Sequence, residues 1–159
     1  MPMLLYGNTS DMNGVDIYAD INPKGRRYAP IWSRFESMCS PHSMPTPLIP
    51  YVDRKDYCQK LEELNKVIAE LHEKRSRSIS QWGLCCFHYN KMRDAKDTLE
   101  VESKRIFKSW RRKGVDVYLL PGSIKPMQTR YKAVTDVPNR LRISVPEEDS
   151  PQHDERRRW

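Results

Sequence analysis

The sequence predicts an α+β domain, a small antiparallel sheet with two amphipathic helices on one face and a disordered C-terminal tail. Three observations lead to this prediction. Apolar and polar residues alternate near residues 14–20, as in a half-buried strand, and they alternate again in two segments after residue 114. Between these strands, two long segments repeat apolar residues at helical spacing. The length of 159 residues fits one domain.

The composition limits how much of the chain can pack into a core. Hydrophobic residues make up 38% and charged residues 31% of the chain, and the mean hydropathy is -0.81. We expect a flexible N-terminus at residues 1–13, one domain at 14–146 and a disordered charged tail at 147–159. No apolar stretch reaches the about 18 residues of a transmembrane helix, and the first residues lack the pattern of a secretory signal. We therefore expect the chain to be exposed to the cytosol.

The first strand is expected at residues 14–20, with three apolar side chains inward, namely Val15, Ile17 and Ala19. Residues 22–25 read Asn-Pro-Lys-Gly, which is turn chemistry. We predict a hairpin into a second strand around residues 26–35, where Pro30 requires an edge or a bulge. Residues 37–50 contain four prolines, so we predict a Pro-rich loop there. A Pro-x-x-Pro recognition peptide is the less favoured alternative.

The first helix has a clear start signal. Asp53 can cap it, Asp56 stands at the third helical position, and Val52 and Tyr57 occupy the positions of a hydrophobic staple. One apolar stripe then runs to about residue 74 through Tyr57, Leu61, Leu64, Ile68 and Leu71. Cys58 lies beside this stripe, and we interpret it as a small buried side chain rather than a reactive thiol.

Residues 75–78 break this pattern, and residues 82–87 form a short apolar island. We expect a second helix from about residue 92 to 113, with one apolar face that holds Leu99, Ile106 and Trp110. Gly114 follows as the residue after the C-cap. Two late strands are expected at residues 115–120 and 141–145, each bounded by proline.

Catalytic, metal-binding and cofactor-binding patterns are missing. The four cysteines, Cys39, Cys58, Cys85 and Cys86, include no Cys-x-x-Cys pair, and the glycines are isolated, so no zinc site and no phosphate loop is expected. Cys86 and His88 are two residues apart, but no third group to orient the histidine is identified. We expect a protein that is not an enzyme and has no cofactor.

The formal net charge of +7 favours an anionic partner, either nucleic acid or a membrane surface. The cations concentrate between residues 104 and 113, around Phe107 and Trp110. Trp110 falls on the apolar stripe, so we assign it to the core rather than to base stacking. A basic face of this kind suits phosphates or anionic lipid, and a solvated helix surface is the third interpretation.

Several segments together resemble the golgin subfamily A member 7 family, the accessory subunits of DHHC palmitoyltransferases that include the yeast Ras-modification subunit. The resemblance covers about residues 14 to 148. The family's Val-x-Ile-x-x-Asp strand matches residues 15–20 and its basic second strand matches residues 26–35. The Asp-Arg pair that opens its first helix, and the Leu-Asn further on, match Asp53-Arg54 and Leu64-Asn65.

The rest of the resemblance lies in the order of several features along the second half of the chain. After a cysteine-bearing apolar middle, the family has a helix, a glycine, a short apolar strand near a proline and a last strand before acidic residues. Here these features correspond to Gly114, residues 117–121, residues 141–145 and Glu147-Glu148. The chain departs from the family at residues 37–50 and between Gly122 and Asn139, which both look like insertions, and its apolar middle is shorter.

The resemblance implies a non-catalytic accessory subunit that binds and stabilises a DHHC-type S-palmitoyltransferase and supports substrate palmitoylation. It implies a peripheral position at the cytoplasmic face of the Golgi or another endomembrane, with Cys85 and Cys86 as S-acylated residues; two buried structural thiols are the alternative. We assign partner binding to four cations of the basic helix, Lys104, Arg105, Lys108 and Arg112. The alternative function is a basic nucleic-acid-associated subunit of a ribonucleoprotein assembly.

Overall fold

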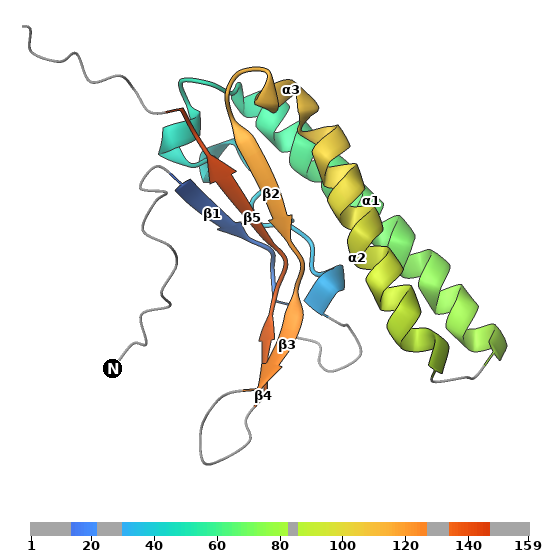
Figure 1. Cartoon of the computed structure of the whole chain (residues 1–159). Helices are drawn as coiled ribbons and strands as arrows, with labels where there is room; N and C mark the ends of the chain where they lie inside the picture. The colour runs from blue at the N-terminus through green and yellow to red at the C-terminus, as the bar shows by residue number, and fades with distance from the viewer. Residues whose placement is uncertain (1–13, 22–29, 83–85, 127–133, 147–159) are drawn as a thin grey trace, which may run out of the picture.

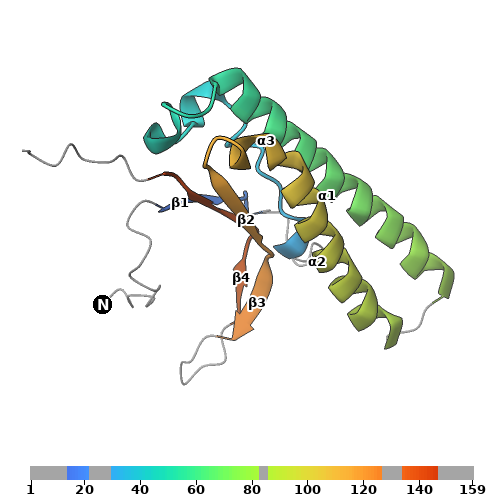
Figure 2. The same cartoon turned by 45° about the horizontal axis from the view of Figure 1, so that its top comes forward.

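In the computed structural model, residues 14–21, 30–82, 86–126 and 134–146 are described. The expected flexible N-terminus at 1–13 and the expected charged tail at 147–159 lie outside these residues. Two helices lie along one side of a small sheet, as Figures 1 and 2 show from two directions. The α+β class predicted from the sequence is confirmed.

The sheet has three antiparallel strands in the order β1 (Gly14–Tyr18), β5 (Arg140–Ser144) and β2 (Asp116–Leu120). Alternation along each strand aligns across the sheet, so that Leu141 lies opposite both Ile17 and Leu119. These three side chains are buried, and they form the sheet's contribution to the core. β5 is therefore the central strand.

A second, two-stranded sheet extends beyond β2 and β5 (Figure 1). It pairs β3 (Ser123–Pro126) with β4 (Val134–Val137) in antiparallel register. The sequence predicts an insertion between Gly122 and Asn139 and does not predict these two strands. Two sequence signals oppose a strand here, the Pro-Gly pair before Ser123 and the proline within β3. The alternation of apolar and polar residues in this segment is too short to predict a strand against them.

The helices differ from their predicted bounds. α1 (Arg54–Trp82) continues through residues 75–78, and α2 (Cys86–Ile106) begins before residue 92 and ends before the short α3 (Lys108–Arg111). The prediction that 75–78 break the helix was wrong, because Arg-Ser-Arg-Ser lacks an apolar stripe but contains no glycine or proline to end a helix. Phe107 leaves helical geometry, with φ of -91° and ψ of 13°, and separates α2 from α3.

The predicted strand at residues 26–35 is also corrected. Residues 22–29 lie outside the described residues, and Pro30–Trp32 form a 3-10 turn, η1, with no strand after it up to residue 35. Proline favours this turn, and the Ser33 hydroxyl donates to the Pro30 carbonyl at 2.6 Å. The Phe35 N–H donates to Oδ1 of Asn65 in α1 at 2.6 Å. The side chain of Asn65, rather than a neighbouring strand, therefore satisfies this backbone group.

The Pro-rich segment at residues 37–50 packs on α1. It contains two 3-10 turns, η2 (Pro41–Ser43) and η3 (Thr46–Leu48), and it buries Met44 and Leu48. The first helix then starts as its sequence predicts, because the Asp53 carboxylate accepts the N–H of Lys55 at 3.2 Å. Gly114 has φ of +83° and follows α3.

The core lies between the sheet and the helices. The stripe of α1 predicted from the sequence is buried at Tyr57, Leu61, Leu64 and Ile68, and half-buried at Leu71. The second predicted face is buried too, through Leu99, Ile106 and Trp110. The periodic apolar positions therefore identify the helix faces that pack, although they do not locate the helix ends.

Leu64 provides the first prediction, since its side chain is 0% exposed at the centre of the α1 stripe. Leu64→Ala is expected to lower the free energy of unfolding by about 2–5 kcal/mol, because buried methyl groups are lost and a cavity remains. Chemical unfolding measures this change. Val101→Ala is the control, because Val101 is 65% exposed in α2. Equal stability of both variants and the wild type would show that the stripe does not form the core.

Candidate functional site

The helices α1 and α2 form a long hairpin whose joined ends lie away from the sheet (Figures 1 and 2). Cys86 is the first residue of α2. Cys85 lies outside the described residues, as does the side chain of Cys86, so their predicted acylation stays a prediction. Cys86 and Lys104 are separated by about 27 Å of helix at 1.5 Å per residue. The fold therefore puts Cys86 and the basic segment at opposite ends of α2.

The four predicted partner-binding cations fall into two pairs. Lys104 forms an ion pair with Glu100 at 2.9 Å, and Arg105 contacts Glu102 at 2.8 Å and Glu63 at 3.3 Å. Lys108 and Arg112 are exposed and form no ion pair with any residue that the structure describes. The second pair is thus free to meet an external anion.

The fold adds further cations that the sequence analysis did not include. The Trp110 indole N–H donates to the Asp56 carboxylate at 2.7 Å, and this bond holds the first turn of α1 against α3. We call the exposed cations that lie next to these two residues in the sequence the basic end; they are Arg54, Lys55, Lys108, Arg112 and Lys113. No local sequence signal joins Arg54 to Arg112, because the Trp110–Asp56 contact spans 54 residues.

The face of the sheet opposite the helices, which we call the outer face, is aromatic and basic. Tyr18 and Tyr118 are 51% and 50% exposed on its two edge strands. Between them, Arg140 and Arg142 of β5 share Asp16 at 3.7 and 3.4 Å, and the Arg140 guanidinium lies 5.9 Å from the centre of the Tyr18 ring. The alternation of apolar and polar residues in β5 puts these two arginines on the outer face, and the register of the three strands brings the two tyrosines to the same face.

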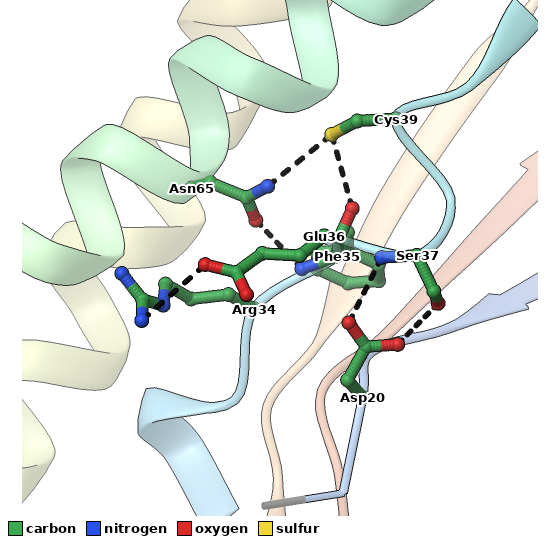
Figure 3. A network of polar contacts seen from close by, with 7 residues as sticks. All are labelled: Asp20, Arg34, Phe35, Glu36, Ser37, Cys39 and Asn65. Atoms are coloured by element: carbon green, nitrogen blue, oxygen red, sulfur yellow. Dashed lines mark hydrogen bonds and ion pairs between the residues drawn. The ribbon is translucent and has the colours of Figure 1, made fainter.

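A polar network joins the chain after η1 to both β1 and α1 (Figure 3). The Asp20 carboxylate accepts the backbone N–H of Ser37 at 2.9 Å and also its hydroxyl. The Cys39 thiol donates to the Phe35 carbonyl at 3.0 Å and accepts from Nδ2 of Asn65 at 3.3 Å. Because these groups satisfy one another, the network holds residues 34–39 in place and does not form a catalytic arrangement.

The thiols near this network are poor nucleophiles. Burial, together with the charge of Glu62, raises the pKa of Cys39 to about 11. Burial also raises the pKa of Cys58, which packs half-buried against the core as the sequence predicts. The thiolate is the reactive form, so neither side chain is activated at neutral pH.

Among the described residues, no group of three or more His, Cys, Asp or Glu side chains is placed to hold a metal ion. In the same part of the chain, no helix is both long enough and apolar enough to cross a membrane. Comparisons of the chain with protein-family models, with curated proteins and with solved structures gave no match.

The raised pKa of Cys39 gives the second prediction. With Cys58, Cys85 and Cys86 all changed to Ser, the rate of Cys39 alkylation by iodoacetamide should rise about tenfold for each pH unit between about pH 7 and pH 10, because only the thiolate reacts. The urea-unfolded chain should level off above about pH 9. Mass spectrometry measures both rates. A plateau below about pH 9 in the folded protein would contradict the assignment.

Proposed function

We propose that this chain is a non-catalytic accessory subunit of a DHHC-type protein S-palmitoyltransferase, which it stabilises at a membrane. One observation supports this proposal above the others. An early strand and two late strands form one sheet, and a helical hairpin lies across it, with Cys86 as the first residue of its second helix and Cys85 just before it in the sequence. This is the order of elements on which the family resemblance depends, apart from the second strand at residues 26–35, which the described part of that segment does not form.

The placement of the cysteines and cations suggests how the subunit attaches. One myristoyl chain gives only marginal membrane binding, and the two further methylenes of palmitate add about 1.6 kcal/mol at about 0.8 kcal/mol each. Stable attachment needs two acyl chains, or one chain and basic residues. The basic end reaches the same membrane as Cys86 only if the hairpin lies along the surface. Otherwise Lys108 and Arg112 are available to a cytosolic part of the partner.

The chemistry of the chain is consistent with a partner that performs the transfer. The sequence contains no Asp-His-His-Cys motif. Cys39 and Cys58 have raised pKa values, so neither is suited to accept an acyl group and pass it on. In this proposal the catalytic cysteine belongs to the transferase, and this chain supplies binding energy and position.

The outer face favours a second candidate function, a basic nucleic-acid-associated subunit of a ribonucleoprotein assembly. Exposed aromatic rings stack on bases, and arginines contact phosphates. Tyr18 and Tyr118 beside Arg140 and Arg142 provide both chemistries on one sheet. Affinity purification of the full chain in mild detergent separates the candidates. A DHHC transferase in the eluate supports the first, whereas RNase-sensitive particles without a transferase support the second and overturn the first.

Acylation of the cysteine pair is the third prediction. Acyl-exchange labelling of the protein from membranes should give a hydroxylamine-sensitive signal that is lost in the Cys85→Ser, Cys86→Ser double variant, because a thioester needs these sulfurs. A Cys39→Ser, Cys58→Ser variant is the control and should keep the signal. A signal that persists in the first variant would refute the assignment.

The fourth prediction concerns the four partner-binding cations. Changing Lys104, Arg105, Lys108 and Arg112 together to Ala should weaken binding to the co-purified transferase, and the loss should be greatest at low salt, because screening shortens the reach of exposed charges to about 8 Å at physiological ionic strength. Most of the loss should come from Lys108 and Arg112, since Lys104 and Arg105 already have acidic partners.

Two double variants separate the contributions of the free and the paired cations. One combines Lys108→Ala with Arg112→Ala, and the other combines Lys104→Ala with Arg105→Ala. Binding is measured with purified complexes at low and high salt. An equal loss in the two double variants would contradict the division between free and paired cations. No loss in the quadruple variant would remove these residues from the interface.

A further inference from the structure

The outer face of the sheet carries two exposed aromatic rings with two arginines between them. Tyr18 on β1 lies opposite Arg140 of the central strand. Tyr118 on β2 lies opposite Arg142, two residues further along the same strand. Both tyrosines are half-exposed, and the helices lie on the other side of the sheet (Figures 1 and 2). A ligand that reaches both rings therefore crosses the two arginines of β5.

The spacing of the two rings fits nucleic acid bases that are splayed apart. Tyr18 and Tyr118 are two strands and two residues apart, which is about 12 Å between their Cα atoms at about 4.8 Å per strand and 3.3 Å per residue. Bases that stay stacked rise only about 3.4 Å per nucleotide along a strand. Splayed bases occur in single-stranded nucleic acid, where aromatic side chains stack on them, whereas neighbouring pairs cover the base faces in a duplex.

The arginines between the rings have charge and donors to spare. Arg140 and Arg142 share one carboxylate, that of Asp16, at 3.7 and 3.4 Å, so this group of three side chains has one unmatched positive charge. The two arginine side chains are 30% and 39% exposed. Each guanidinium has five N–H donors, and one shared carboxylate cannot occupy all of them. Phosphates that link bases on the two tyrosines would therefore meet cationic donors.

The Asp16 carboxylate favours RNA over DNA. It is within ion-pair distance of both arginines, yet it accepts no hydrogen bond from any residue that the structure describes. This carboxylate repels a phosphate, but it can accept a hydrogen bond from a hydroxyl group. RNA has a 2′-hydroxyl on every ribose, whereas DNA has none. An unused acceptor between the two rings is therefore an advantage for RNA and only a repulsion for DNA.

We propose that the outer face binds single-stranded RNA across its three strands. Two splayed bases stack on Tyr18 and Tyr118. The phosphates between them contact Arg140 and Arg142, and a ribose 2′-hydroxyl donates to Asp16. Stacking and phosphate contacts do not distinguish the bases, so binding is tolerant of sequence. RNA binding at this face deepens the second candidate function, on which it rests for the class of partner, and it does not require a transferase.

The test uses the full chain and an RNA octamer of alternating cytidine and adenosine, which cannot pair with itself. Fluorescence anisotropy at physiological ionic strength should show that this octamer binds about tenfold more tightly than the DNA octamer of the same sequence, because one hydrogen bond to a carboxylate is lost. In NMR spectra, the ring protons of Tyr18 and Tyr118 should shift when the RNA is added. Those of Tyr57, which is fully buried in the core, should not.

Variants of the two tyrosines test stacking. Tyr18→Ala and Tyr118→Ala should each weaken binding of the RNA octamer by at least about fivefold, because one stacked base is lost. Tyr18→Phe and Tyr118→Phe are the matched controls and should bind as the wild type does, since the ring is kept. Unchanged NMR signals of Tyr57 show that each variant is folded.

Variants of the two arginines test the phosphate contacts. Arg140→Gln with Arg142→Gln should reduce the slope of the logarithm of the binding constant against the logarithm of salt concentration by about 1.4, since each phosphate contact to a single strand contributes about 0.7. Lys108→Gln with Arg112→Gln makes the same change of charge at the basic end and is the control. It should leave the RNA-induced shifts of both tyrosine rings in place.

Binding of the RNA octamer without shifts at the two rings, or no binding at all, would overturn the proposal. Equal affinity for the DNA octamer would overturn the assignment to RNA. Ring shifts with vesicles containing phosphatidylserine but not with RNA would assign the face to a membrane instead. If RNase-sensitive particles co-purify from cells while the octamer does not bind, the second candidate function stands and only the assignment of the outer face fails.

Discussion

The bond from the Trp110 indole to Asp56, 2.7 Å long, is the contact on which the arrangement of helices and sheet depends. The ring of Trp110 is fully buried between Tyr57 and Phe107, with centroids 6.4 and 4.9 Å away. Its carbonyl accepts the N–H of Val115, so one residue connects α1, α3 and the chain that enters β2. The same residue therefore positions both the first turn of α1 and the start of β2.

Asn139 provides the matching constraint at the other end of the sheet. Its fully buried side chain accepts the Gly122 N–H at 2.7 Å and donates to the carbonyls of Ile31 and Ser33 at 2.7 and 2.9 Å. A buried amide with all these bonds is stable only in one arrangement of three distant segments, because any unmade bond leaves a polar group desolvated. This requirement explains why η1 takes the place of the second strand that the turn at residues 22–25 predicts.

Features that depend on local interactions could be predicted from the sequence, and features that depend on contacts between distant residues could not. Leu61, Leu64 and Ile68 were predicted as core because burial of one helix face imposes a local period. The continuation of α1 to Trp82 depends on the absence of glycine and proline before residue 83, and the break at Phe107 is a change of backbone angles, neither of which periodicity reports. The basic end was predictable for Lys108 and Arg112 but not for Arg54, since a bond between residues 56 and 110 joins them.

The fold also separates the four cysteines into two chemical classes. Burial raises the pKa of Cys39 and Cys58, and Cys39 is held by hydrogen bonds to Phe35 and Asn65. Cys86 begins α2, at the joined end of the hairpin, and Cys85 precedes it in the sequence. Acylation requires a thiolate that a second active site can reach. In the proposed function, the raised pKa values of Cys39 and Cys58 disfavour their acylation, so selectivity for the vicinal pair follows from the fold rather than from the sequence around each cysteine.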